Sequence, residues 1–235
     1  MIIDYHVHLS DDLTVARAVA LAEQRGMKFG IVEHPGAGSP IETDADMLAY
    51  IQRLRAYPVY AGLQPMHIYW AQDFSPEVIA QVDYVLMDAD TIPLDDGSWL
   101  SIWRRDNFIE DMDAFIARYI KHIVHILTNE PIHIFARPTY LPINFARHYD
   151  EVWTEDRMRL IIDLAKARNI ALEIAENVRV PSLRFIRMAK DAGIKFTFGT
   201  NARNQNAGNF HYCLEMAEEA GLTQEDMWYI GERGK

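Results

Sequence analysis

Short runs of apolar and β-branched residues alternate along the chain with longer segments that are apolar on one face. Side chains repeat every two residues on a strand and every 3.6 on a helix, so the short runs predict strands and the long ones predict helices. The predicted strands are residues 2–7, 28–32, 59–63, 84–87, 132–136, 171–174 and 195–198. The predicted helices are residues 13–25, 44–55, 76–81, 106–127, 154–167, 181–192 and 209–220. Strict alternation predicts an α/β fold with a parallel sheet and helices outside it.

Residues at the predicted helix ends agree with these boundaries. Thr154 lies at a helix start, and Pro76 and Pro181 occupy first helical positions. Residues of the type that ends a helix in the left-handed conformation are Gly26, Asn169, Gly193 and Gly221. Residues 91–105 follow neither pattern and are expected to form an irregular lid or partner surface.

The length of the chain suits one barrel domain, and we predict a single domain over residues 1–235. The chain has 34 acidic and 23 basic residues, a formal net charge of −11, and no basic run. Because such a surface repels phosphate backbones, nucleic acid is not an expected partner. The oligomeric state stays open.

The sequence also favours a cytoplasmic protein. Cys213 is the single cysteine, which indicates a reducing compartment, and residues 1–6 do not resemble a signal peptide. No apolar run reaches the roughly 18 residues that span a bilayer, so no membrane association is expected.

Polar residues cluster at the C-terminal ends of the predicted strands. They are Asp4, His6, His8, His34, Gln64, Asp88, Asp90, Arg137, Glu173, Asn201 and Arg203. In a βα barrel these ends meet at one rim, where active sites form. Because buried polar groups are costly without partners, a metal or a ligand, this pattern predicts a functional site.

His6 and His8 are the strongest motif, because residues two apart on a strand share a face and both imidazoles can reach one cation. Asp4 has the same parity and is expected to orient one imidazole. The alternative is a pair of hydrogen-bonded core histidines.

These segments together resemble the PHP (polymerase and histidinol phosphatase) family of metal-dependent phosphoesterases. Asp-Tyr-His-Val-His-Leu at residues 4–9 resembles the first family motif, and Leu-Glu-Ile at residues 172–174 matches a later one. The other similar segments are residues 31–34, 62–64, 83–90, 134–138, 199–203 and 217–223. The resemblance spans nearly the whole chain and implies a distorted seven-stranded (β/α)7 TIM-like barrel.

Several positions depart from the family's metal ligands. The resemblance retains His6, His8 and His34 as ligands. Gln64 stands where the family has a glutamate, and Asn201 stands where it has an aspartate. Three further positions that are histidines in the family hold Asp90, Arg137 and Arg203. We therefore expect one or two divalent ions (Zn, Mn or Fe) instead of three. The expected metal-site residues are His6, His8, His34, Gln64 and Asn201.

Arginine cannot lose its proton in a protein, so Arg137 and Arg203 cannot ligate a metal. Their guanidinium groups are instead expected to bind a small anionic, phosphorylated substrate. Asp90 and Glu173 complete the predicted catalytic set. Three roles stay open for Asp88 and Asp90: metal binding, acid–base catalysis and a salt bridge to Arg137. Glu173 has the same three possibilities, whereas strand parity directs Glu33 away from the site.

Three functions follow from this pattern. The first is a metal-dependent hydrolase of a phosphate ester, and the second is a degenerate domain that binds an anion without turnover. The third is an amidohydrolase-like enzyme, since such barrels also begin with a His-X-His strand, but its later ligand positions have no clear match.

Overall fold

The computed structural model describes residues 1–231 and shows a closed barrel of seven parallel strands. The strands, in barrel order, are β1 (Ile3–Val7), β2 (Lys28–Glu33), β3 (Tyr60–Leu63), β4 (Tyr84–Met87), β7 (Ile134–Phe135), β8 (Ala171–Ala175) and β9 (Phe196–Gly199). Pairing of Asp4 with Phe198 joins β1 to β9 and closes the ring. The predicted α/β barrel with seven strands is therefore confirmed.

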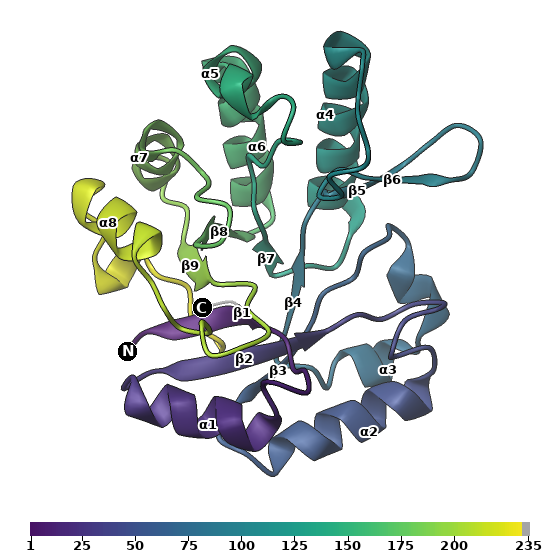
Figure 1. Cartoon of the computed structure of the whole chain (residues 1–235), viewed down its shortest axis with the longest axis vertical. Coiled ribbons are helices and arrows are strands. Elements are labelled where there is room, and N and C mark those ends of the chain that lie inside the picture. The colour runs from purple at the N-terminus through teal and green to yellow at the C-terminus, as the bar shows by residue number, and fades with distance from the viewer. Residues whose placement is uncertain (232–235) are drawn as a thin grey trace.

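Helices surround the strands on the outside (Figure 1). They are α1 (Val15–Gln24), α2 (Asp44–Arg55), α3 (Pro76–Ile79), α4 (Met112–Asn129), α5 (Tyr149–Val152), α6 (Glu155–Ala167), α7 (Leu183–Asp191) and α8 (Tyr212–Glu219). No helix in residues 1–231 is long and apolar enough to cross a membrane.

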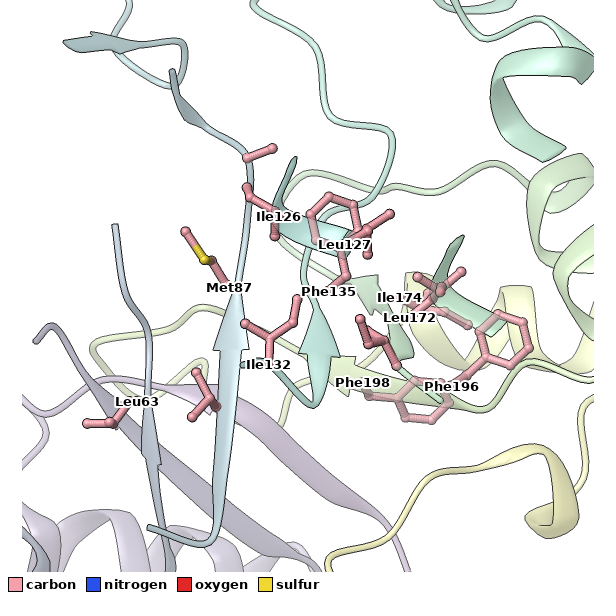
Figure 2. Packing of buried hydrophobic residues seen from close by; sticks show 14 of the residues in the cluster. Leu63, Met87, Ile126, Leu127, Ile132, Phe135, Leu172, Ile174, Phe196 and Phe198 are labelled. Carbon is pink, nitrogen blue, oxygen red and sulfur yellow. The ribbon is translucent and has the colours of Figure 1, made fainter. Parts of the chain in front are cut away.

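Apolar side chains on the outer strand faces pack against these helices. Figure 2 shows part of this layer, in which residues such as Met87 of β4 and Phe135 of β7 belong to one cluster with Ile126 and Leu127 of α4. All four side chains are at most 1 % exposed. Burial of this layer fixes the strands in the ring, because removing apolar surface from water is the main stabilising contribution to folding.

A second apolar cluster inside the barrel contains aliphatic residues such as Leu86 and Ile134 and the aromatic residues Tyr5, Tyr84 and Trp228. Tyr84, the first residue of β4, donates a 2.6 Å hydrogen bond from its hydroxyl to the carbonyl of Tyr5. Its ring lies against Gly30 and Gly62, where a Cβ atom would come within 2.8 and 2.6 Å of ring carbons. The open space of the barrel therefore lies at the opposite, C-terminal end of the strands.

Several predicted boundaries are wrong. Residues 91–105 contain an antiparallel hairpin of β5 (Thr91–Pro93) and β6 (Trp99–Ser101). Helix α4 begins after Asp111, whose side chain accepts the amide N–H of Ala114, and not at residue 106. Pro181 precedes α7, which Ser182 caps. In each helix the capping side chain decides the start, because it satisfies an otherwise unpaired N–H.

Candidate active site at the mouth of the barrel

A buried ion network lies at the centre of the mouth. Strands β4 and β7 are neighbours, so Asp88 and Asp90 after β4 meet Arg137 after β7. Nη2 of Arg137 donates to Oδ2 of Asp88, and Nη1 lies 3.0 Å from Oδ2 of Asp90. All three side chains are buried. Of the roles left open for the aspartates, the structure shows the salt bridge.

The two aspartates differ in acidity. Burial alone raises the pKa of Asp88, but the charge and hydrogen bond of Arg137, with the N–H of Asp90, hold that pKa below its ordinary value. Burial raises the pKa of Asp90 well above its ordinary value despite the charge of Arg137, and the negative charges of Asp88 and Glu173 raise it further. Arg137 is therefore paired chiefly with an ionised Asp88.

The position of Arg137 depends on its backbone. Strand alternation predicts that it shares a face with Phe135, yet Phe135 packs in the outer apolar layer while Arg137 lines the mouth. Arg137 has a φ of 48°, in the left-handed region, which breaks the alternation after the strand. Asn201, with a φ of 50°, follows β9 in the same conformation. Such backbone positions are often associated with functional sites.

His6 is held on both sides of its ring. Nδ1 lies 2.8 Å from Oε1 of Glu173, and Nε2 lies 3.1 Å from Oε1 of Gln64. The Gln64 amide in turn donates to Oδ2 of Asp88 at 2.8 Å. Glu173 also accepts the backbone N–H of Arg137 at 3.1 Å. His6, Gln64 and Glu173 therefore form a hydrogen-bonded frame around the ion network.

His8, Glu33 and His34 form the candidate cation site. One ligand atom from each of these residues lies within 4.8 Å of the others. Nε2 of His8 is buried and has no hydrogen-bond partner in the described part of the chain. Nδ1 of His34 is bound to the Gln64 carbonyl at 2.8 Å, which leaves its other nitrogen for a ligand. Two imidazoles and a carboxylate suit Zn, Mn or Fe.

Burial keeps both imidazoles of this site neutral. It lowers the pKa of His8 well below its ordinary value, and neighbouring His6 and Arg203 lower it further. Burial also lowers the pKa of His34. Neutral imidazole is the form that ligates a metal. Glu33 was expected to point away; its Oε1 instead accepts the N–H of His34 at 3.0 Å, which turns the carboxylate back toward the site.

The expected role of Asp4 is wrong. Its Oδ2 accepts the Thr200 hydroxyl at 2.6 Å and the Gly208 N–H at 2.8 Å, so it fixes the loop after β9. The pairing of β1 with β2 shifts register between Asp4 and Val7, which breaks the simple alternation along β1. Glu173, not Asp4, is the carboxylate bound to the His6 imidazole.

A cavity of about 580 Å³ opens above the network. Its wall includes the predicted residues His34, Gln64, Arg137, Asn201 and Arg203, and also Asp88. Asp90 and Glu173 do not line this cavity; they lie buried behind its wall. The strand ends thus bring most of the predicted residues to one space, with two of the predicted catalytic acids in a supporting layer.

Trp103 and Arg105 are among the residues of the cavity wall that were not predicted as site residues. They follow the β5–β6 hairpin, within residues 91–105, for which the sequence predicts a lid or a partner surface. Arg105 and Arg203 are exposed at the cavity, and neither guanidinium has a carboxylate within 4.0 Å in residues 1–231. Arg137 is neutralised by its aspartates, so these two arginines are the cations available to an anion.

No family model matches the chain, and no curated protein matches it. A solved structure described as a cryo-EM structure of archaeal ribonuclease P with mature tRNA contains a similar chain, with 11 % sequence identity and a TM-score of 0.46. The match covers 99 % of this chain and 100 % of that one. This similarity is too low to carry an argument about function. The chain is a parallel α/β barrel whose polar side chains gather at the C-terminal mouth.

Proposed function

We propose that the chain is a metal-dependent hydrolase of phosphate esters that works with one divalent cation. The observation that carries the proposal is the unpartnered, buried Nε2 of His8, which lies with Glu33 and His34 beside an arginine-lined cavity. The resemblance to the PHP family implies the same reaction class, and membership of that family stays a prediction.

His8, Glu33 and His34 would hold the cation, and its donor set would leave further coordination positions open. When bound, a Zn, Mn or Fe ion polarises a phosphoryl oxygen and lowers the pKa of water toward neutrality. Arg203 and Arg105, which line the cavity, would bind the phosphoryl oxygens. Asn201, also in the cavity wall, offers an amide hydrogen-bond donor.

One ion fits this mouth better than two or three. Arg137 already occupies the space between Asp88 and Asp90 with a permanent positive charge. A second cation beside these carboxylates would be repelled by the guanidinium group. His6 and Gln64 are held by other hydrogen bonds, so we propose a smaller ligand set than the five residues predicted from the sequence.

Metal analysis and phosphatase assays test this proposal together. Purified protein is dialysed against Zn²⁺ or Mn²⁺, its metal content is measured by mass spectrometry, and phosphate release from p-nitrophenyl phosphate is followed. We expect about one equivalent of metal and metal-dependent turnover. His8→Ala and His34→Ala should lose both, because each removes one of the three ligands. His148→Ala, at a surface histidine paired with Glu151, is the matched control.

The proposal fails if the protein binds three equivalents of metal, or if turnover persists in His8→Ala. Circular dichroism of each variant separates loss of the site from loss of the fold. Retained metal binding without any turnover would support the alternative below.

The alternative is a domain that binds a phosphorylated ligand without hydrolysing it. The buried pairing of Arg137 with Asp88 and Asp90 favours this alternative, because it uses two carboxylates that otherwise could serve a catalytic metal. Phosphate binding in the absence of metal, retained in His8→Ala and lost in Arg203→Met, would distinguish it from the enzyme.

A further inference from the structure

A second cavity of about 550 Å³ adjoins the proposed active site. Trp103, Arg105, Tyr140, Asn177 and Val178 line both cavities, so the two spaces meet along a shared wall. A phosphoryl group occupies only a small part of the first cavity. The second cavity therefore provides room for the part of a substrate that lies beyond the phosphate.

The wall of the second cavity is mainly apolar and aromatic. Beyond the shared residues it includes Ile102, Leu141, Ile143, Tyr149 and Tyr212. Tyr149 and Tyr212 use their hydroxyls within the protein: Tyr149 bonds with Thr139 at 2.6 Å, and Tyr212 donates to the carbonyl of Pro181 at 2.6 Å. Because their hydroxyls are already hydrogen-bonded, these tyrosines would contact a ligand mainly through their aromatic rings.

The charged side chains that line this wall are arginines, two of which are paired with carboxylates outside it: Arg104 with Asp106 and Arg179 with Glu215. Arg104, Arg105 and Arg179 line the second cavity, and no Asp, Glu or Lys does. This contrasts with the formal net charge of −11 of the whole chain. Arg105 lies at the junction of the two cavities and has no carboxylate partner in residues 1–231, so it is placed for the ester end of a ligand.

We infer that the substrate is a phosphate ester whose leaving alcohol carries a large aromatic group. The phosphoryl group binds in the first cavity with Arg203, and the aromatic body occupies the second cavity against Trp103 and Tyr140. Arg105 contacts the bridging region between them. This inference rests on the proposed phosphoesterase function and adds the class of substrate to it.

Binding of phosphonates tests the inference without relying on turnover, because their C–P bond is not hydrolysed. Affinities of Mn²⁺-loaded protein for methylphosphonate, phenylphosphonate and 1-naphthylphosphonate are measured by isothermal titration calorimetry. We expect 1-naphthylphosphonate to bind at least about tenfold tighter than methylphosphonate, because its rings bury apolar surface against the aromatic wall. Trp103→Ser should reduce this ratio to below about threefold.

Trp99→Ser is the matched control, because Trp99 is a second exposed tryptophan of the same segment and lines neither cavity. It should keep the full preference. Arg105→Met should weaken all three phosphonates about equally, since each carries the same charged group. Equal binding of methyl- and naphthylphosphonate, or an unchanged ratio in Trp103→Ser, would overturn the inference.

Hydrolysis assays with the matching phosphate monoesters distinguish the two proposals. Turnover of small alkyl phosphates without preference for naphthyl phosphate overturns the substrate class and leaves the phosphoesterase function standing. Tight binding of naphthylphosphonate with no hydrolysis of any ester overturns the phosphoesterase function instead.

Discussion

At the residue scale, Arg137 takes a place that the family resemblance gives to a histidine ligand. A histidine there would leave Asp88 and Asp90 free for metal, whereas the arginine pairs with both. Removal of the guanidinium group would be costly, because neither water nor another cation would then neutralise the buried carboxylate. The arginine thus stabilises the mouth, and under the proposed function it would also limit the number of metals bound there.

Arg137→Met is expected to lower the free energy of unfolding by about 3–5 kcal/mol at pH 7, measured by urea denaturation. The loss arises because the ionised carboxylate of Asp88 is left buried without its counter-charge. The triple variant with Asp88→Asn and Asp90→Asn should recover much of it. Arg159→Met, which removes an exposed pair with Glu155, is the control and should change stability little. A loss no greater than that of the control would contradict this account.

At the element scale, α4 packs against α6 and β5. Its inner face carries apolar residues such as Ile123 and Ile126, and His122 lies buried among them. Burial, with a smaller effect from His125, lowers the pKa of His122 to about 4. His122 is therefore part of the packing of α4, and we expect its protonation to destabilise this helix.

Replacement of His122 by Phe or by Gln should remove an acid-dependent loss of stability. The folded pKa of about 4 lies below the ordinary value of 6.5, so the unfolded chain binds a proton that the folded chain excludes. This penalty is absent at pH 7 and grows as the pH falls from about 6.5 to 4, to about 3 kcal/mol at most.

Urea denaturation of the wild type and both His122 variants at pH 7 and pH 4.5 measures this effect. The wild type should lose more stability over this interval than either variant, because neither Phe nor Gln titrates there. Equal losses in all three proteins would show that His122 takes up a proton without cost in the folded state.

At the scale of the whole molecule, charge is distributed unevenly. The formal net charge is −11, yet the two adjoining cavities are lined by arginines and by one carboxylate, Asp88. The net charge of the chain therefore repels large anions over a long range, whereas the arginines of the cavities attract small anions locally. A small anion meets mainly the arginines of the mouth, whereas a long polyanion is also repelled by the negative net charge of the chain.

The isolated chain is expected not to bind nucleic acid appreciably. Fluorescence anisotropy with a labelled 20-nucleotide RNA and a DNA duplex, at about 50 mM salt, should show no binding at tens of micromolar protein, because few phosphates could be neutralised. Measurable binding that weakens steeply with added salt would reveal a basic surface that the overall charge does not indicate.

A cytoplasmic location likewise stays a prediction.

The sequence by itself determined the barrel and the end at which polar groups collect. Seven apolar runs alternate with amphipathic segments, and hydrophobic periodicity is a local property that can be read from the chain. Residues such as His34, Gln64 and Arg203 follow strand ends, and parallel strands deliver their ends to one rim. These positions needed no knowledge of long-range contacts.

Only the tertiary structure decided which of these groups are free. The left-handed backbone of Arg137, the register shift in β1 and the returning carboxylate of Glu33 each depart from simple alternation. Pairing between strands distant in sequence then ties His6 into hydrogen bonds and leaves Nε2 of His8 without a partner among the described residues. Such pairing depends on distances across the closed barrel, which periodicity along the chain does not encode.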